Sequence, residues 1–334
     1  MSSRPGTTHL ERQIRSQPEE LERMLSSTQT AAQVHEATQG LHRARRIWVV
    51  GTGTSQHAAA LGAGMLQEAG RAAHAVSAMQ FVRWAPIVGP QDAVVIITHT
   101  AETAYALSAH ALAFDAGLDV VMVTKRGGGF PHTVETVDKE TSETYTVSYT
   151  TAVLALAMIA RELGADSLTD EVLGAVPDAV RSALNDPGID AIPTPTRLLV
   201  FAGAGPASTT AREAALKVRE GARFLAEGYD AEYLLHGSAV PLTAEDRLVT
   251  LAPPDTDGFV AAMADAAERA GVPVSRVTEP AELPSVLAQI PLAARLQLLA
   301  LRIASERGQD PDTVITGPWA DEALWALGGP RPEA

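Results

Sequence analysis

The chain has 334 residues, of which 46% are hydrophobic and 20% charged, a globular composition long enough for two domains. Its formal net charge of −14 argues against nucleic acid as the main partner, because a phosphate backbone is bound by clustered cations. The absence of cysteine excludes disulfides, thiolate nucleophiles and cysteine-ligated metals.

A single small anion remains compatible with an acidic protein, because a few backbone N–H groups can hold a phosphate. No apolar run reaches the roughly 20 residues that span a bilayer, and residues 1–6 lack the apolar stretch of a secretory signal. We therefore expect a cytoplasmic protein without a membrane partner. Nearly all of its basic residues are arginine, and the lysines are Lys125, Lys139 and Lys217.

The polar segment 10–41 has apolar residues at helical spacing and predicts one or two lead-in helices. After it, short apolar runs alternate with longer, alanine-rich segments. Alternating βα units with fully apolar strands predict a parallel sheet covered by helices on both faces. The predicted strands lie at residues 46–50, 93–97 and 119–124, and the predicted helices at 55–69 and 102–116.

The same series begins again in the second half of the chain. The apolar run 198–201 leads into Gly203-Ala204-Gly205 just as 48–50 leads into Gly51-Thr52-Gly53, and two later strands repeat in order. The three offsets are 152, 154 and 154 residues, which indicates an internal duplication. We predict an α/β protein with two doubly wound, flavodoxin-like lobes in tandem. The predicted parts are lead-in helices at 1–44, a first domain at 45–185 and a second domain at 196–334, with prolines between the domains.

The first candidate site is Gly51-Thr52-Gly53-Thr54-Ser55, which follows a predicted strand and opens a helix. Glycines permit a tight turn, and a helix N-terminus with the hydroxyls of Thr54 and Ser55 favours an anion. An ordinary N-capped turn explains the same residues, since Ser and Thr are good caps. A dinucleotide site is disfavoured, because the third glycine of G-x-G-x-x-G is missing.

The second candidate runs from Thr98 to Thr103 and also joins a predicted strand to a helix. Three threonine hydroxyls converge there at the carboxyl edge of the sheet, where open α/β sheets bind ligands. The alternative is an imperfect Thr-x-x-Glu capping box. His99, taken alone, is more often a packed or surface histidine than a catalyst.

The third candidate is a predicted helix on which Glu213, Lys217 and Glu220 share one face at i,i+4 and i,i+3 spacing. A lysine beside a carboxylate can keep that carboxylate ionised, as a general base requires. A solvated row of salt bridges is the alternative. The lysine is nonetheless the one lysine of the second half of the chain.

The fourth candidate is the polar segment 227–238, which predicts an irregular loop. His236-Gly237 would present a histidine on a tight turn, and an imidazole suits proton transfer near neutral pH. The alternative is a loop histidine without a role.

Together these segments resemble the isomerase half of glucosamine-6-phosphate synthase and its relatives, the fructosamine deglycases and glucosamine-6-phosphate deaminases, which carry two sugar-isomerase (SIS) domains. The family's G-T-S turn is similar to Gly53-Thr54-Ser55, and its S-x-S-G-x-T phosphate loop to Thr98–Thr103. Its E-x-A-L-K-x-K-E helix is similar to Glu213–Glu220, and its A-E-x-Y…E-L-x-H-G-P segment to Ala226–Ser238.

This resemblance implies roles for the matching residues. Glu220 would move a proton between C1 and C2, and Lys217 would tune Glu220. His236 would reach over from the partner subunit of a homodimer and open the sugar ring or protonate the substrate. The resemblance implies no cofactor and no metal. The sugar phosphate would be held by Thr54, Ser55, Thr98, His99, Thr100 and Thr103.

Several positions depart from the family pattern. Threonines replace serines in the phosphate loop, and Ala101 replaces its glycine. Tyr145-Thr146-Val147 stands where Ser-Thr-Lys is expected, and no lysine follows Lys217, so the synthase's Schiff-base lysine is missing. Without a cysteine or a glutaminase domain, glutamine-fed synthesis is not expected of this chain.

We therefore expect an enzyme that isomerises, deaminates or deglycates an amino sugar phosphate whose nitrogen is already attached. Plain aldose–ketose isomerisation is equally compatible with the residues. The alternative is a non-catalytic sugar-phosphate sensor or regulator, which the missing lysines favour and which Lys217, Glu220 and His236 oppose. No fused helix-turn-helix is recognisable, so a transcription regulator is not expected.

Overall fold

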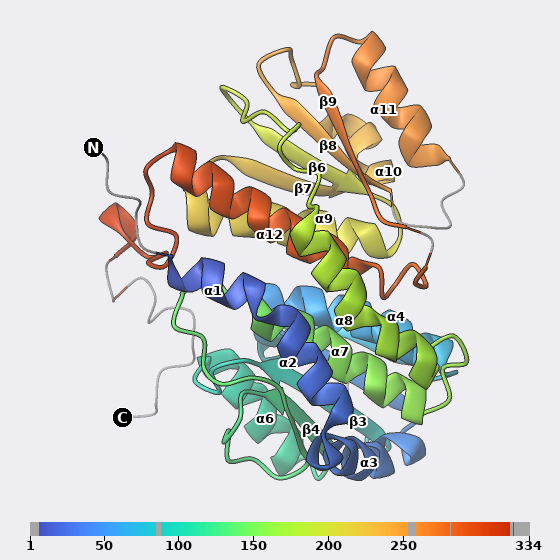
Figure 1. The fold of residues 1–334 in the computed structure, drawn as a ribbon. Helices are drawn as coiled ribbons and strands as arrows, with labels where there is room; N and C mark the ends of the chain where they lie inside the picture. The colour runs from blue at the N-terminus through green and yellow to red at the C-terminus, as the bar shows by residue number, and fades with distance from the viewer. Residues whose placement is uncertain (1–6, 85–87, 253–257, 281, 321–322, 324–334) are drawn as a thin grey trace. The chain divides into compact units, whose positions relative to one another are not determined.

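The computed structural model describes residues 7–84, 88–252, 258–280, 282–320 and 323. They form two parallel β-sheets, each with helices on both faces (Figure 1). The predicted α/β class with parallel sheets is confirmed.

Two compact units are present, each built around one sheet. The N-terminal-sheet unit contains the described residues of Glu19–Lys139, Ser148–Ala175 and Ile315–Ala334. The C-terminal-sheet unit contains those of Met1–Pro18, Glu140–Val147 and Val176–Val314. Each sheet lies within one of the predicted ranges 45–185 and 196–334, whereas segment 140–147 belongs to the compact unit of the second sheet.

The N-terminal sheet has the order β2-β1-β3-β4-β5, and its neighbouring strands are parallel. All seven residues of β3 are buried, because helices cover both sheet faces. Its strands are β1 (Arg46–Gly51), β2 (Ala73–Ser77), β3 (Asp92–Thr98), β4 (Asp119–Thr124) and β5 (Thr133–Glu135).

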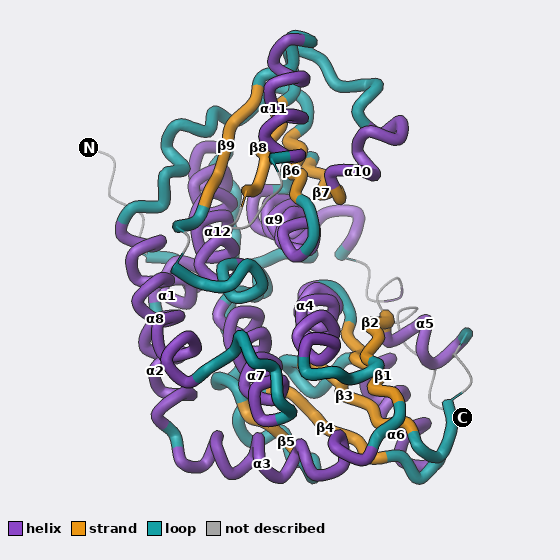
Figure 2. The backbone as a smooth tube through the Cα atoms, turned by 90° about the vertical axis from the view of Figure 1, so that its right-hand side faces the viewer, coloured by secondary structure: helices purple, strands orange, loops and turns teal. Residues whose placement is uncertain are grey.

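Helices pack on the two faces of this sheet in separate groups (Figure 2). α4 contacts β1, β2 and β3, and it lies close to α7, because a Cβ on Gly62 would come within 2.7 Å of the Leu156 side chain. On the other face, side chains of α5 and α6 form an apolar cluster with Val94, Ile96 and Met122. The helices in this part of the sequence are α2 (Gln17–Ser26), α3 (Thr28–Arg43), α4 (Thr54–Glu68), α5 (Ala78–Arg83), α6 (Ala104–Asp115), α7 (Val147–Glu162) and α8 (Asp170–Asn185).

The C-terminal sheet has the order β7-β6-β8-β9 and is also parallel. α9 packs on β6 and β7 and is covered by α12, while α11 packs on β8 and β9 around Val260 and Met263. The elements are β6 (Leu199–Gly203), α9 (Pro206–Ala222), β7 (Ala226–Asp230), α10 (Ala231–Tyr233), the π-helical turn η1 (Leu234–Ser238), β8 (Arg247–Ala252), α11 (Phe259–Arg269), β9 (Val274–Thr278), α12 (Gln289–Glu306) and the 3₁₀ turn η2 (Gly317–Trp319); α1 (His9–Arg15) also belongs to this unit.

Matched details in the two units support the predicted duplication. The order β2-β1-β3-β4 has its counterpart in β7-β6-β8-β9. At the amino end of β3, Asp92 receives two hydrogen bonds from the Arg46 guanidinium, and at the amino end of β8, Asp246 receives two from Arg197. A backbone N–H three residues earlier also donates to each carboxylate, at 2.9 Å for Asp92 and 2.8 Å for Asp246.

Some local expectations were wrong. The lead-in segment contains three helices rather than one or two, because the Ser27 hydroxyl accepts a hydrogen bond from the Thr30 N–H and starts a new helix. Residues 227–230 of the segment predicted to be irregular belong to the edge strand β7 (Ala226–Asp230). Edge strands are short and only partly buried, so they lack the continuous apolar run that identifies β3.

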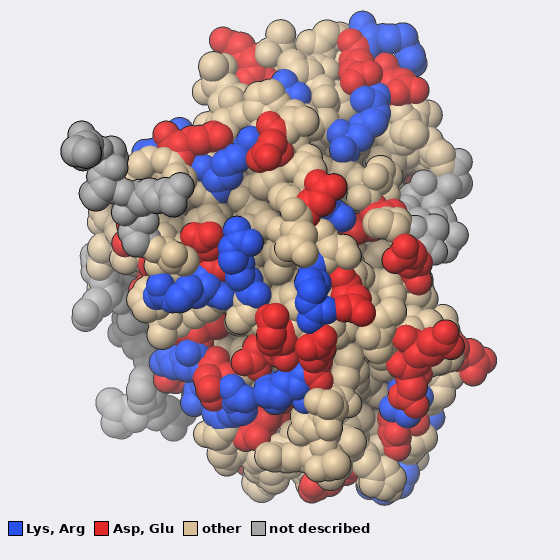
Figure 3. Space-filling model, in the orientation of Figure 1, with Lys and Arg blue, Asp and Glu red and all other residues tan. Residues whose placement is uncertain are grey.

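Charged side chains of both signs are interspersed on the face drawn in Figure 3. Among the described residues, no helix is long and apolar enough to cross a membrane.

Candidate functional site

The turn from β1 to α4 depends on two glycines. A Cβ on Gly51 would lie 2.3 Å from the Ser55 carbonyl oxygen, and Gly53 has φ 57°, a left-handed conformation that favours glycine. Gly53 is also the N-cap of α4 and supplies no side-chain cap. Thr54 and Ser55, both partly buried, therefore form the first turn of α4 at the carboxyl edge of the N-terminal sheet.

The loop from β3 to α6 lies at the same edge, because β1 and β3 are hydrogen-bonded neighbours. The Thr98 side chain is buried, and its hydroxyl has no hydrogen-bond partner among the described residues. Thr103 is the N-cap of α6 but makes no side-chain cap bond, so the capping-box interpretation is wrong. Instead, the Thr100 hydroxyl accepts the Glu102 N–H at 3.2 Å. The described structure thus brings all six predicted substrate-binding residues to two adjacent strand-to-helix connections, those after β1 and β3.

Ala101 has φ 60°, in the left-handed region where a Cβ is unfavourable. It stands where the family's phosphate loop has a glycine, so the loop keeps the glycine conformation without the glycine.

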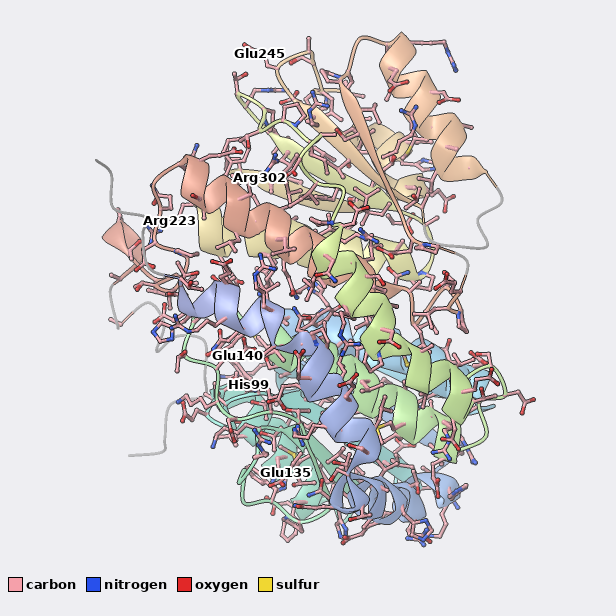
Figure 4. All side chains as sticks on the ribbon, viewed as in Figure 1. His99, Glu135, Glu140, Arg223, Glu245 and Arg302 are labelled. Atoms are coloured by element: carbon pink, nitrogen blue, oxygen red, sulfur yellow. The ribbon has the colours of Figure 1, made fainter. Side chains whose placement is uncertain are left out.

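His99, labelled in Figure 4, is partly buried in the loop that follows β3. Burial first, and then the positive charges of Lys125 and Lys139, together lower the pKa of its imidazole to about 4. At neutral pH the ring is therefore uncharged and can only donate or accept hydrogen bonds. The lysines supply the positive charge in this region.

In the C-terminal-sheet unit, α9 carries a row of two carboxylates with a lysine between them. The Lys217 Nζ lies 2.6 Å from Glu220 and 3.6 Å from Glu213, and the side chains of Lys217 and Glu213 are each 1% exposed. α12 covers this helix. The row of salt bridges is therefore buried, and the solvated alternative is wrong for Glu213 and Lys217.

Burial and charge compete in this row. Burial lowers the pKa of Lys217, but Glu220 and Glu213 outweigh it, so the pKa is raised and the lysine stays charged. Burial raises the pKa of Glu220, and the ammonium of Lys217 partly offsets this. A carboxylate with a raised pKa beside a fixed ammonium has the properties of a general base.

A third carboxylate, Glu140, was missed by sequence reasoning (Figure 4). It is buried, accepts the Thr146 N–H at 3.1 Å and the Thr146 hydroxyl at 3.2 Å, and its charge contributes to the raised pKa of Lys217. In the sequence it sits beside Asp138 and Lys139 and so has the pattern of a solvated charged run. The segment 140–147 approaches α9 where Thr144 is 3.6 Å from the position of a Cβ on Gly221.

His236 lies on the π-helical turn η1, with Gly237 at φ 109°. This agrees with a histidine presented on a tight turn. Its side chain is 74% exposed, and Nε2 lies 3.9 Å from Glu232. In the described part of the chain, it makes neither a hydrogen bond nor an ion pair with Glu220 or Lys217. Exposed apolar side chains surround it in sequence, namely Tyr233, Leu235 and Val240.

Among the described residues, no group of three or more His, Asp or Glu side chains could hold a metal ion. The chemistry available to this arrangement is hydrogen bonding to an anion at the first sheet and proton transfer by buried carboxylates on α9.

The fold is that of an α/β protein with parallel sheets, and its glycine turn and threonine-rich loop lie at the carboxyl edge of the first sheet. Residues 40–160 match the SIS domain family, which confirms the resemblance predicted from the sequence.

Named proteins with similar sequences or folds act on sugar phosphates. The glutamine–fructose-6-phosphate aminotransferase [isomerizing] of Pyrococcus horikoshii is 29% identical over 298 residues, which are 80% of this chain and 50% of that protein. The tagatose-6-phosphate ketose/aldose isomerase of Escherichia coli has a TM-score of 0.81 at 20% identity, covering 95% of this chain and 98% of that one. The glucosamine-6-phosphate deaminase of Thermotoga maritima has a TM-score of 0.75 at 18% identity, covering 91% and 97%.

The chain spans about half the length of the curated aminotransferases that it matches. At identities of 18–20%, the likeness to the two solved structures establishes the fold.

Proposed function

We propose that this protein is an enzyme that binds a phosphorylated sugar and moves a proton between its C1 and C2. The observation that carries this proposal is the buried row on α9, in which the Lys217 ammonium lies 2.6 Å from Glu220. Burying an ion pair seldom stabilises a fold more than apolar residues would, so a functional reason is expected for its presence. The match of residues 40–160 to the SIS domain family supports the sugar phosphate as the ligand class.

The proposal assigns binding and proton transfer to different residues. The phosphate is held through hydrogen bonds by Thr54, Ser55, Thr98, His99, Thr100 and Thr103. Glu220 removes the proton from C2 of the open-chain aldose and returns it to C1. Lys217 keeps Glu220 ionised, and His236 of a partner subunit opens the ring.

An amino sugar phosphate is the favoured substrate. Proton transfer from C2 to C1 converts a 2-amino-aldose into an imine at C2, which water hydrolyses to the ketose and ammonia. The substrate brings its own nitrogen, so no protein lysine has to form an imine, and no lysine follows Lys217 in the sequence. The same proton transfer on a sugar without nitrogen is aldose–ketose isomerisation.

The test is proton exchange with solvent. The protein is incubated in deuterated water with glucosamine 6-phosphate, fructosamine 6-phosphate or fructose 6-phosphate, and C1 and C2 are followed by NMR. We expect deuterium at one of these carbons with at least one sugar, even where net conversion is slow, and loss of this exchange in Glu220→Gln.

A sugar-phosphate sensor is the second candidate. It is favoured by Tyr145-Thr146-Val147, which lacks the lysine expected at that place, and by the absence of any later lysine. A sensor would bind one of the same sugars without exchanging a proton, and its affinity would tolerate Glu220→Gln and His236→Asn. Tight binding without exchange therefore rejects the enzyme and supports the sensor.

A further inference from the structure

The two sheets present different groups at the carboxyl edge, although their turns have the same backbone. Gly53 has φ 57° and ψ −127°, and its counterpart Gly205 has φ 55° and ψ −131°. The first turn continues with Thr54 and Ser55, whereas the second continues with proline and alanine, which offer no hydroxyl. At the carboxyl ends of β3 and β4, Thr98 is paired with Thr124. The corresponding pair at the ends of β8 and β9 is Ala252 with Thr278.

The residue after β4 is Lys125, and the same 154-residue offset places Glu279 after β9. The buried carboxylate of Glu279 forms an ion pair with Arg295, so its charge already has a partner within the protein. Lys125 is partly buried and, within the described residues, its ammonium forms no ion pair. The charge at this position is therefore reversed between the sheets, and only the carboxylate has a protein counter-ion.

Lys125 is tied to the phosphate loop by its backbone. Its N–H donates to the His99 carbonyl at 3.1 Å, and the neighbouring Thr124 hydroxyl donates to the same carbonyl at 3.3 Å. The positive charge of Lys125 also contributes to the lowered pKa of both His99 and Glu102, in agreement with this backbone contact. The sequence did not reveal this, because Lys125 is far from Thr98 along the chain.

Lys139 is the other ammonium near this loop, but it already has a partner. Its Nζ lies 2.8 Å from both carboxylate oxygens of Glu102, and both side chains are exposed. His99 carries no charge at neutral pH, as shown above. Of the groups named at this edge, Lys125 is thus the one whose positive charge is not already neutralised.

We propose that Lys125 is a specificity-determining residue that binds the phosphate group of the substrate and makes the site select a dianionic phosphomonoester. The inference rests on the proposed function. It adds a positively charged side chain to a phosphate site whose other proposed groups are hydroxyls, backbone amides and a neutral imidazole. A partly buried ammonium gains most from a partner with two negative charges, because Coulomb attraction grows with the charge product. A charge-assisted hydrogen bond also exceeds a neutral one in strength.

The test measures the affinity for fructose 6-phosphate and glucosamine 6-phosphate, with inorganic phosphate as a third probe, by calorimetry at constant ionic strength. Lys125→Met keeps the aliphatic stem and removes the charge, and we expect it to weaken binding roughly 10- to 100-fold. Lys125→Arg should regain most of the affinity because the charge is restored. Lys139→Met is the matched control and should change binding less than about threefold, since its exposed pair is solvent-screened.

Dependence on pH separates a phosphate ligand from a structural role. Wild-type affinity should rise between pH 5.5 and 7.5 as the phosphate becomes a dianion, and Lys125→Met should flatten this rise. The lowered pKa of His99, about 4, keeps its ring neutral over that range, and the pKa of Glu102 is lowered too, so the phosphate of the probe is the group that titrates.

The outcomes distinguish the two proposals. If the double variant Thr100→Val/Thr103→Val loses affinity for the sugar phosphates while Lys125→Met retains it, the assignment of the phosphate to the Thr98–Thr103 loop is supported. The role of Lys125 is then rejected. If neither changes affinity in a protein that binds or turns over a sugar phosphate, the phosphate lies elsewhere and both assignments are rejected. A wild-type protein that binds none of the three probes also rejects the inference. Circular dichroism of each variant establishes that it is folded.

Discussion

The ammonium nitrogen of Lys217 lies between two carboxylates of its own helix, 2.6 Å from Glu220 and 3.6 Å from Glu213, and it is almost fully buried. Glu140, from a segment 77 residues earlier in the sequence, adds a third negative charge to the same environment. One cation among three carboxylates makes Lys217 the group on which the others depend.

Lys217→Met should therefore lower the free energy of unfolding by about 3–5 kcal/mol, because it leaves buried carboxylates without a counter-ion. Urea unfolding at pH 7 measures this. The raised pKa of Lys217 means that its stabilisation is present at neutral pH and is lost as pH rises through the folded-state pKa. Lys139→Met, which removes an exposed pair, should cost less than about 1 kcal/mol. Equal costs for the two variants would contradict a buried charge cluster.

Glu220→Gln should lower turnover of the sugar that shows proton exchange by roughly 10²–10⁴-fold, with little change in its affinity. The variant keeps the shape of the side chain and removes the proton acceptor. In the wild type, kcat/KM should rise with pH through the raised pKa of Glu220, and this acidic limb should vanish in the variant. Glu171→Gln, at an exposed position in the first turn of α8, is the matched control and should leave the rate unchanged.

His99 should make the protein sensitive to mild acid. Its folded-state pKa of about 4 lies below the ordinary 6.5. Between these two pH values His99 is therefore protonated in the unfolded chain and neutral in the folded protein. Stability should fall as pH drops from 6.5 to 4, by about 3 kcal/mol at most from this one group. The difference in unfolding free energy between wild type and His99→Gln, measured across this range, isolates the effect. A difference independent of pH would show that His99 titrates normally.

Ala101→Gly should raise the free energy of unfolding by about 0.5–1 kcal/mol, because a Cβ at φ 60° costs more than the extra freedom of glycine in the unfolded chain. Ala116, the C-cap of α6 at φ −79°, provides the comparison. There the same substitution relieves no strain and should lower stability. Parallel changes at both positions would mean that Ala101 is not strained.

Much of the fold could be predicted because its central strands carry uninterrupted apolar runs. The predicted strand 119–124 is β4, and 93–97 lies inside β3. Edge strands such as β2 and β7 were missed, since their exposed faces remove the apolar signal. The turn motifs were also readable, because a glycine at positive φ before a helix is a local requirement.

The electrostatics of the site could not be predicted in the same way. Glu213, Lys217 and Glu220 have the same spacing on a solvated helix as on a buried one, and only packing against α12 separates the two. Glu140 and Lys125 reach their neighbours through contacts that are distant in sequence. The sequence pattern therefore located the local motifs, but the structure was needed to show which charged groups lie beside them.

The exposed position of His236 suggests a last prediction about assembly. Its side chain is 74% exposed on η1, beside Tyr233, Leu235 and Val240, which are apolar and at least half exposed. Such a segment is suited to a subunit interface. If His236 acts in the site of a partner subunit, Glu220→Gln and His236→Asn should be inactive separately but complement each other when mixed. In a 1:1 mixture of freely exchanging dimers, half of the molecules are heterodimers with one intact site, so about a quarter of wild-type activity should return. Sedimentation at micromolar concentration should show the dimer, and mixing Glu220→Gln with a Glu220→Gln/His236→Asn double variant is the control that should stay inactive. No recovery in a dimer that does exchange subunits would place both residues in the site of one chain.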